Sequence, residues 1–293
     1  MRYILILISI GLLIAIQSCR LDDLAFNPTA IEEYLLEDSP YKDERVLLPD
    51  SYDIDPSLID IITLQSGNET IYTVYIGDKS RIGQDTVILY CHGNSGNMDS
   101  YWERAKALAN AGGKNRFGVF MMDYRGYGMS TGTPSEEGMY EDVDACMQWL
   151  KGMGLSDDRL VAYGFSLGSA PATELTAKPR SMQPSKLIME APFASFDYMS
   201  QTIAKISMAG SYYGNLEIDN AEEIKVVEEP FLWIHGIEDA FIPIDNGERV
   251  IANYQGSHLV ERRIPGGEHS TVPTAMGIAS YIQLMGDFIT GAI

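Results

Sequence analysis

The chain has 293 residues, 45% of them hydrophobic, and a formal net charge of −20 at pH 7. This length and apolar content suffice for one large domain or two small ones with a sizeable core. The charge argues against nucleic-acid binding, because no stripe of Lys and Arg is present to neutralise phosphates. It equally disfavours broad electrostatic adhesion to anionic lipid.

The N-terminus has the pattern of an export signal. After a positively charged start, residues 3–16 form an almost unbroken apolar run, which Gln17-Ser18-Cys19 closes. The run is shorter than the ~20 residues needed to cross a bilayer and fits the core of a signal peptide. A small residue followed by Cys19 resembles the cleavage box of bacterial lipoproteins. That resemblance implies removal of residues 1–18 and lipidation of Cys19.

Two other interpretations of this segment stay open: an uncleaved anchor, and an ordinary secretory signal with an incidental cysteine. If Cys19 is lipidated, the protein is an exported bacterial lipoprotein on the periplasmic or cell-surface face of a membrane. Each buried methylene contributes about 0.8 kcal/mol, so several acyl chains would anchor it stably. Residues 19–57 are then an N-terminal spacer and extension, and acidic residues 21–42 lift the enzyme off the membrane.

Strands and helices alternate through the rest of the chain. A hairpin is predicted first, with strands at 61–64 and 71–76 around a turn at 66–68. Further strands are predicted at 86–91, 117–122, 159–163, 186–189, 231–234 and 260–264. Apolar runs without alternation, such as 86–91, indicate strands covered on both faces. Helical patterns occupy 98–111, 139–151, 169–178, 246–254 and 275–289. This order predicts an α/β domain at 58–293, with a mostly parallel central sheet and helices on both faces.

The most informative motif is Gly164-Phe165-Ser166-Leu167-Gly168, at the junction of a predicted strand and helix. This is the pattern of a nucleophile elbow. Such a turn holds the serine in strained backbone geometry with its hydroxyl group presented, and side chains at the flanking positions would collide with neighbouring chain. Taken alone, the motif also fits an ordinary tight turn.

A second glycine-containing loop, His92-Gly93-Asn94-Ser95-Gly96, follows the strand that ends at Cys91. Its backbone could direct an N–H group towards Ser166, and the N–H group of Leu167 would supply a second donor. Two such donors make an oxyanion hole, worth ~3 to 4 kcal/mol per donor. A phosphate-binding loop is the other interpretation, but the Lys-Ser/Thr pair that completes such a loop is missing.

The segment after the strand at 231–234 supplies a candidate acid. Asp239 falls where a carboxylate could orient a histidine. Glu238 is an alternative at the neighbouring position, and Asp245 is a weaker one.

His269 is the candidate base, because it lies in the Gly266-Gly267-Glu268-His269 loop after the last predicted strand. The order serine, acid, histidine along the chain is that of α/β hydrolases. The three other histidines, which are expected to shape loops or to begin a strand, are His92, His235 and His258.

Together these motifs resemble those of serine hydrolases with the α/β-hydrolase fold, in the small-lid branch of esterases and serine aminopeptidases. The resemblance rests on residues 92–96, 123–130, 164–168, 236–243 and 267–269. It covers about residues 61–289 and implies a short lid at about 193–229.

The resemblance also implies residue roles. Ser166 is the nucleophile, His269 the general base and then acid, and Asp239 the residue that orients His269. The N–H groups of Leu167 and Asn94 form the oxyanion hole, with Ser95 as an alternative to Asn94.

Two further expectations concern structural residues. In this family the Asp123–Ser130 segment builds a turn, in which Arg125 and Asp123 are expected to pair. Cys91 and Cys146 fall in separately buried elements, which favours free thiols over a disulfide.

The chemistry implied is nucleophilic acyl transfer through an acyl-enzyme. No cofactor is expected, and no metal, since metal-ligand spacings such as H-E-x-x-H are missing. An aromatic and Met-rich lid suits a small-molecule acyl substrate, although these side chains could equally pack on the sheet.

Hydrolysis of carboxylic esters or thioesters is therefore the favoured function. One alternative is a serine aminopeptidase or acyl-peptide hydrolase, in which Glu190 or Asp197 would read a substrate amine. The other is a non-catalytic surface binding protein on a hydrolase fold.

Overall fold

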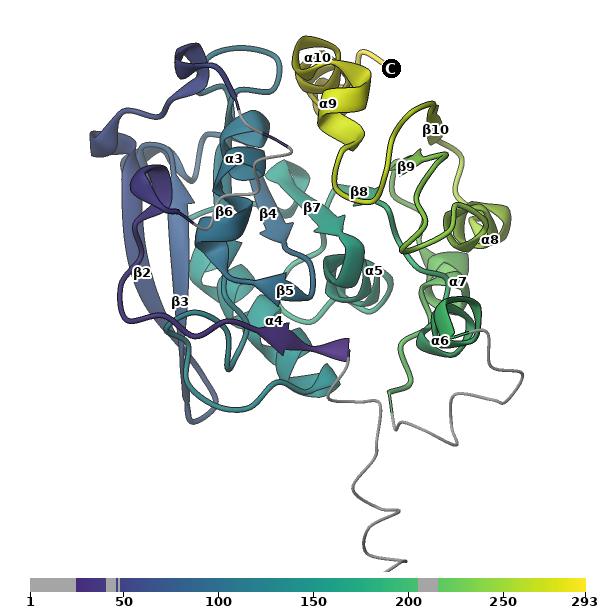
Figure 1. Ribbon diagram of the computed structural model, residues 1–293. Helices are drawn as coiled ribbons and strands as arrows, with labels where there is room; N and C mark the ends of the chain where they lie inside the picture. The colour runs from purple at the N-terminus through teal and green to yellow at the C-terminus, as the bar shows by residue number, and fades with distance from the viewer. Residues whose placement is uncertain (1–24, 41–45, 47, 205–215) are drawn as a thin grey trace, which may run out of the picture.

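The computed structural model describes residues 25–293 apart from 41–45, 47 and 205–215. Cys19 and the whole predicted leader lie outside the described residues, as does part of the predicted lid. Within the described part, a sheet of eight strands forms the centre, in the order β10-β9-β8-β7-β4-β6-β3-β2 (Figure 1).

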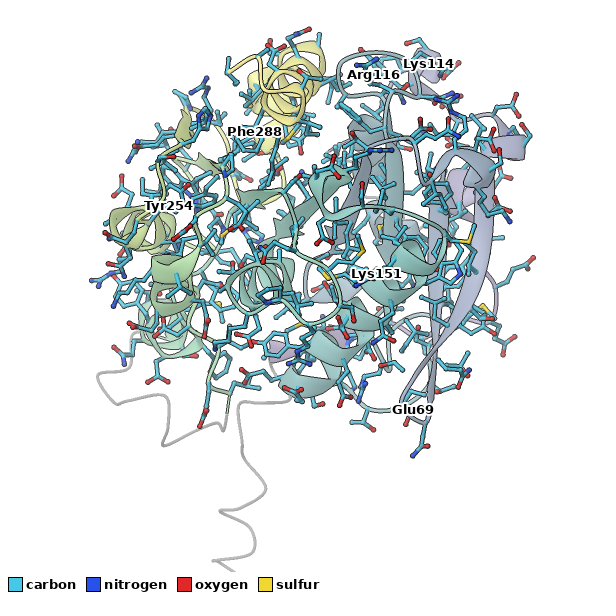
Figure 2. All side chains as sticks on the ribbon, turned by 180° about the vertical axis from the view of Figure 1, so that it is seen from behind. Glu69, Lys114, Arg116, Lys151, Tyr254 and Phe288 are labelled. Atoms are coloured by element: carbon cyan, nitrogen blue, oxygen red, sulfur yellow. The ribbon has the colours of Figure 1, made fainter. Side chains whose placement is uncertain are left out.

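The sheet is parallel from β10 to β6, and β3 and β2 join its edge as antiparallel strands. Its strands are β2 (Ile59–Ser66), β3 (Glu69–Ile76), β4 (Val87–Cys91), β6 (Gly118–Met122), β7 (Leu160–Phe165), β8 (Lys186–Glu190), β9 (Phe231–Gly236) and β10 (Leu259–Ile264). The predicted hairpin is confirmed as β2 and β3, whose tip is marked by Glu69 in Figure 2. The predicted α/β-hydrolase fold, with its mostly parallel sheet, is likewise confirmed.

Helices cover both faces of this sheet (Figure 1). They are α3 (Met98–Ala109), α4 (Glu136–Gly152), α5 (Ser169–Ala177), α6 (Phe196–Ala204), α7 (Asn220–Glu223), α8 (Asp245–Asn253), α9 (Val272–Met276) and α10 (Ile278–Thr290). Among the residues described, no helix is both long enough and apolar enough to cross a membrane.

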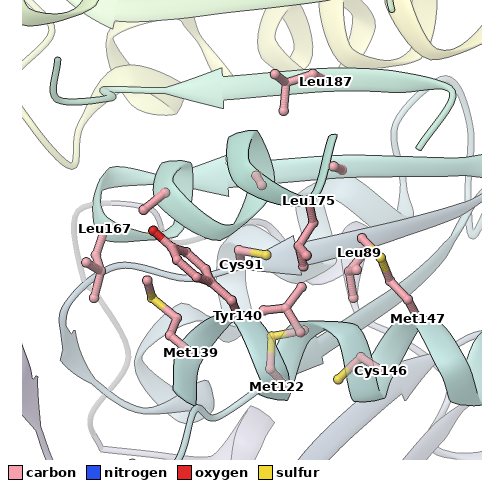
Figure 3. Packing of buried hydrophobic residues seen from close by; sticks show 14 of the residues in the cluster. Leu89, Cys91, Met122, Met139, Tyr140, Cys146, Met147, Leu167, Leu175 and Leu187 are labelled. Atoms are coloured by element: carbon pink, nitrogen blue, oxygen red, sulfur yellow. The ribbon is translucent and has the colours of Figure 1, made fainter. Parts of the chain in front are cut away.

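Two hydrophobic cores lie on opposite faces of the sheet, and the parallel strands β4, β6, β7, β8 and β9 contribute to both. Along β4, Leu89 and Cys91 join one core while Ile88 and Tyr90 join the other. This double burial explains why the strand reads as a continuous apolar run. Figure 3 shows side chains of the first core, in which Cys91 of the sheet and Cys146 of α4 are buried free thiols, as predicted.

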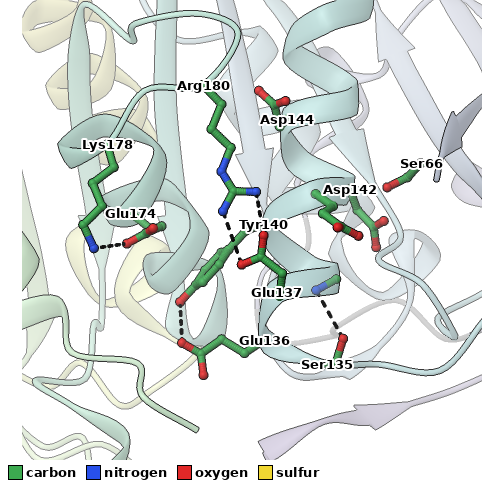
Figure 4. Close-up of polar contacts among 12 residues, drawn as sticks. Ser66, Ser135, Glu136, Glu137, Tyr140, Asp142, Asp144, Glu174, Lys178 and Arg180 are labelled. Atoms are coloured by element: carbon green, nitrogen blue, oxygen red, sulfur yellow. Dashed lines mark hydrogen bonds and ion pairs between the residues drawn. The ribbon is translucent and has the colours of Figure 1, made fainter.

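Helix α4 begins three residues before its predicted start, because Ser135 caps it. The Ser135 hydroxyl group accepts a hydrogen bond from the N–H group of Gly138 at 3.2 Å (Figure 4). The outer surface of the helix is tied to its neighbours by ion pairs such as Arg180 with Glu137. The predicted C-terminal helix is instead two helices, α9 and α10, which Gly277 separates with a φ of +82°.

The segment expected to be a spacer is packed on the domain. Ala25, Phe26 and Leu36 are buried in the cores. A short strand, β1 (Asn27–Pro28), pairs in parallel with β5 (Ser95–Gly96). From residue 25 onward, the described part of this segment therefore belongs to the folded domain and does not hold it away from an anchor.

We expect Gly286→Ala to lower the free energy of unfolding by about 1–3 kcal/mol through overpacking. A Cβ atom at Gly286 of α10 would lie 2.5 Å from the Cα atom of Gly112, which follows α3. Gly152→Ala is the matched control, since its Cβ atom meets no atom within 4 Å. Urea unfolding followed by circular dichroism measures both, and an equal loss in the control would contradict the close approach.

Candidate active site

Ser166 stands at a sharp turn between β7 and α5. Its φ is +54°, a left-handed conformation that few non-glycine residues adopt. The flanking glycines make this turn possible. A Cβ atom at Gly164 would lie 2.4 Å from the carbonyl oxygen of Gly168, and one at Gly168 would lie 1.9 Å from that of Cys91. The local geometry is therefore that of a nucleophile elbow.

The structure brings Ser166, His269 and Asp239 together. The Ser166 Oγ atom lies 2.9 Å from His269 Nε2, and His269 Nδ1 lies 2.8 Å from Asp239 Oδ2. The three residues follow β7, β10 and β9 respectively, so all come from the carboxyl edge of the parallel sheet. The Asp239 side chain is fully buried, whereas that of His269 is 16% exposed.

The loop after β9 is folded around the Asp239 carboxylate. Asp239 Oδ1 accepts hydrogen bonds from the N–H groups of Phe241 and Ile242, at 2.9 and 2.8 Å. Burial favours the neutral acid, but hydrogen bonds from His235 and His269 outweigh it and hold the pKa of Asp239 well below its usual range. An ionised Asp239 accepts the Nδ1 proton of His269, which leaves Nε2 free to accept the proton of Ser166.

The loop that carries Asn94 lies beside the elbow that carries Leu167. Cys91 pairs with Gly164 across β4 and β7. A Cβ atom at Gly93 would lie 3.3 Å from the ring of Phe165. The Gly93 carbonyl oxygen is 2.7 Å from His92 Nδ1, and in a trans peptide the following N–H group points the opposite way. The Asn94 N–H group is therefore directed away from the His92 ring.

Comparison with known proteins gives the family. A sequence profile described as alpha/beta hydrolase fold matches residues 86–206. The uncharacterized protein YfhR of Escherichia coli K12 is 31% identical over 210 residues, which are 70% of this chain and 70% of that protein. The chain belongs to the alpha/beta hydrolase family.

Two further similarities lie within this family. The lysophosphatidylserine lipase ABHD12 of Mus musculus is 30% identical over 181 residues, 56% of this chain and 44% of that protein. The solved structure of the Pyrococcus furiosus esterase Pf2001 superposes with a TM-score of 0.64 at 15% identity, covering 90% of this chain and 98% of that one. The latter similarity concerns the hydrolase fold alone.

Of the three candidate acids in this hydrolase, Asp239 is the one hydrogen-bonded to His269. Glu238 accepts a hydrogen bond from the N–H group of Gly266 at 2.6 Å. Asp245 accepts one from the Tyr198 hydroxyl group.

His235 is a contact of the acid that the sequence analysis did not identify. Its Nε2 atom lies 2.9 Å from the carbonyl oxygen of Ile242 and 3.4 Å from Asp239 Oδ2. A carbonyl oxygen can only accept, so Nε2 carries the proton and donates it towards both groups. His235 therefore shapes the loop that carries Asp239, in keeping with the prediction that this histidine shapes a loop. It also adds positive potential beside the Asp239 carboxylate. The signal in the sequence was its position four residues before Asp239.

The expected pair of Arg125 with Asp123 does not form. Arg125 reaches α4 instead, where its Nη2 atom lies 2.8 Å from both Asp142 and Glu141. A bidentate carboxylate partner on α4 suits a guanidinium group better than a single contact two residues away. Asp123 is turned to the opposite side and contacts His92 Nε2 at 3.1 Å.

Glu190 cannot read a substrate amine, because its side chain is fully buried beneath the site. It accepts hydrogen bonds from Arg104, Tyr163 and Tyr281. Burial opposes the charge on Arg104, but Glu190 outweighs it and raises the pKa of the guanidinium group. Arg104 also lies 4.3 Å from the Phe165 ring and donates to the carbonyl oxygen of Ser270, so the pair links the elbow to the histidine loop.

Asp197, the other acid considered for that role, lines an open hollow of about 490 Å³ between α6 and α8. Tyr198 and Arg249 also line this hollow, and Ser166 does not. Glu190 is therefore enclosed, and Asp197 lies on a hollow that Ser166 does not line.

The Asp239→Asn variant is expected to lose about 1–3 kcal/mol of unfolding free energy at pH 7. The pKa of Asp239 is lower in the folded protein than in the unfolded chain, where it is about 3.9. The contribution of ionised Asp239 to the free energy of unfolding is therefore complete above pH ~3.9 and is lost as the pH falls towards the pKa of the folded state. The difference from the wild type should therefore shrink with acidification in urea unfolding between pH 7 and about pH 3.5.

Asp219→Asn is the control of opposite sign, because burial raises the pKa of Asp219. Relative to this variant, the wild type should gain stability as pH falls. If both differences changed in the same direction, the electrostatic account of Asp239 would be contradicted.

Proposed function

We propose that the protein is a serine hydrolase that cleaves carboxylic esters or thioesters through an acyl-enzyme. The observation that carries this proposal is the continuous hydrogen-bonded series from Ser166 Oγ through the His269 ring to the buried carboxylate of Asp239. This series supports the proposal, because acyl transfer requires a nucleophile, a base and an orienting acid in this order, and its two hydrogen bonds measure 2.9 and 2.8 Å.

In this mechanism, His269 Nε2 takes the hydroxyl proton as Ser166 Oγ attacks the acyl carbon. Asp239 fixes the Nδ1–H tautomer and stabilises the imidazolium. The backbone N–H groups of Leu167 and Asn94 donate to the developing oxyanion. Breakdown of the tetrahedral adduct transfers the proton from His269 to the leaving alcohol or thiol. Water then attacks the acyl-enzyme, with His269 as base and afterwards as acid, and releases the carboxylic acid.

The rim of the site favours substrates with an apolar portion. The Phe241 ring is 48% exposed and its centroid lies 4.9 Å from that of His269. Ile237, on the same loop, is 44% exposed. An exposed aromatic ring beside His269, with a second exposed apolar side chain on the same loop, suits an acyl chain or an apolar leaving group. That two similar proteins are named a lipase and an esterase supports the same choice.

The peptidase alternative lacks such support, since the Glu190 carboxylate is enclosed by Arg104, Tyr163 and Tyr281. The labelling experiment described below distinguishes a peptidase, and also a non-catalytic binding protein, from the proposed esterase.

We also propose that the enzyme acts at a membrane, to which a lipidated Cys19 anchors it from the exported side. The support is the apolar run at 3–16 followed by Gln17-Ser18-Cys19. The partners are then a small-molecule acyl substrate and the lipid bilayer.

The test is turnover of p-nitrophenyl esters of graded acyl length by the wild type and Ser166→Ala. We expect Ser166→Ala to lower kcat/KM by at least about 10³-fold and Asp239→Asn by about 10³- to 10⁴-fold, because the nucleophile or the tautomer of its base is lost. Ser57→Ala, a hydroxyl deletion at an exposed turn beside Asp55, is the matched control and should keep wild-type activity.

Labelling with a fluorophosphonate separates the alternatives. Labelling of Ser166 without ester turnover would redirect the proposal to peptide substrates. If neither occurred, the protein would be a binding protein, and the proposed catalysis would be refuted.

A further inference from the structure

The N-terminal segment at residues 25–36, called the N-terminal strap here, lies along the loop that carries Asn94. In Figure 1, β1 runs beside β5 at the carboxyl edge of the sheet. That segment belongs to neither the sheet nor the covering helices. Besides burying Ala25, Phe26 and Leu36 in the cores, this segment makes polar contacts with the loop that carries Asn94.

The first set of contacts is a backbone ladder. The Asn27 N–H group donates to the carbonyl oxygen of Asn94 at 2.9 Å, and the Thr29 N–H group donates to that of Gly96 at 3.1 Å. The Asn97 side chain closes the ladder with a 3.2 Å hydrogen bond to the carbonyl oxygen of Thr29. Three successive hydrogen bonds thus join the strap to residues 94–97.

This ladder fixes the orientation of the peptide after Asn94. The Asn94 carbonyl oxygen also accepts a hydrogen bond from the Tyr127 hydroxyl group at 2.9 Å. With both acceptor directions of this oxygen used, the peptide plane between Asn94 and Ser95 has one orientation. The N–H group of Ser95, one of the two candidates for the oxyanion donor, belongs to this peptide and is held with it. The N–H group of Asn94, the other candidate, belongs to the preceding peptide, between Gly93 and Asn94.

The second set of contacts reaches the other end of the same loop. The Tyr34 hydroxyl group accepts a hydrogen bond from the Met129 N–H group at 3.0 Å and donates to Asp123 Oδ2 at 2.7 Å. Asp123 Oδ1 contacts His92 Nε2 at 3.1 Å, and His92 Nδ1 contacts the carbonyl oxygen of Gly93.

Glycine at position 128 makes room for the hydrogen bond between the Tyr34 hydroxyl group and Asp123. A Cβ atom there would lie 1.9 Å from Asp123 Oδ2 and 2.4 Å from the Tyr34 hydroxyl oxygen. Both peptides that flank Asn94 are therefore oriented by hydrogen bonds that originate in the strap.

We propose that the N-terminal strap positions the oxyanion donor, with Asn27 and Tyr34 as positioning residues that act through the 92–97 loop. This inference rests on the proposed function, because it concerns the donor for the same acyl-transfer step. None of the strap contacts described above involves Ser166 or His269. We therefore expect the strap to affect how strongly the oxyanion donor stabilises the transition state.

The experiment compares two substitutions of Asn27 in the full chain. Asn27→Pro removes the N–H group that binds the Asn94 carbonyl oxygen. Asn27→Ala keeps this N–H group and removes only the exposed side chain, which makes a long hydrogen bond of 3.4 Å to the Ser95 hydroxyl group. We expect kcat for a p-nitrophenyl ester to fall about 10- to 100-fold in Asn27→Pro, since loss of a whole donor costs about 10²- to 10³-fold. KM should stay within about twofold, and Asn27→Ala should match the wild type.

A second pair of variants tests the other contacts. Tyr34→Phe should lower kcat in the same manner. Tyr72→Phe, which removes the hydroxyl group of a ring 6.0 Å away, is its matched control. Affinity for a boronic acid, whose adduct with serine resembles the tetrahedral intermediate, should fall in parallel with kcat.

Hydrogen exchange of the amides at 93–97 supplies a readout that needs no catalysis. Their exchange should accelerate at least about fivefold in Asn27→Pro relative to Asn27→Ala. Unchanged amide exchange in Asn27→Pro would show that the strap does not stabilise the loop at 92–97, which would overturn the proposal. Faster exchange with unchanged kcat and boronic-acid affinity would show that the strap does not position the oxyanion donor, which would also overturn it.

If Asn27→Pro failed to fold, Tyr34→Phe would test the proposal by the same measurements. A wild type without turnover or Ser166 labelling would instead refute the proposed function itself, whatever the exchange result.

Discussion

The site depends on a close approach of two backbone segments, the elbow after β7 and the end of β4. The Cα atom of Gly168 lies against the carbonyl groups of Cys91 and His92 so closely that no side chain fits between them. Because Ser166 precedes Gly168 and Asn94 follows His92, this one contact places Ser166 beside the loop that carries Asn94. Backbone pairing and hydrophobic burial hold β4 and β7 together. The missing side chain of Gly168 then lets the turn after β7 approach the end of β4.

The buried ion pair of Arg104 and Glu190 orients loops of the site, whereas hydrophobic burial stabilises the fold. Arg104 and Glu190 are enclosed beneath the elbow, where a well-packed apolar pair could give equal stability. Their directional contacts, however, reach Ser270 next to His269 and the Phe165 ring next to Ser166. We therefore infer that this pair fixes local geometry, since it connects the end of β7 at Phe165 (165) with the loop at Ser270 (270), which lies 105 positions later in the sequence.

The sequence predicted features that depend on local pattern and failed where long-range contacts decide. Buried parallel strands and the elbow at Ser166 carry strong local signals, so their positions were predicted to within a few residues. The strap carries none, because β1 and β5 span two residues each and their pairing joins positions 68 residues apart. The partner of Arg125 depended likewise on where α4 packs, and the break at Gly277 on a single positive φ inside an otherwise helical pattern.

The strained conformation of Ser166 links stability to reactivity. A non-glycine residue at a φ of +54° costs about 1–3 kcal/mol and persists only where its surroundings determine it fully. Here the surroundings are Gly164 and Gly168, the Cys91 carbonyl group and the hydrogen bond to His269. Replacement of the serine by glycine would relieve the strain and remove the hydroxyl group at the same time. The chain thus retains a conformational cost at the position where the Ser166 hydroxyl group meets the His269 ring.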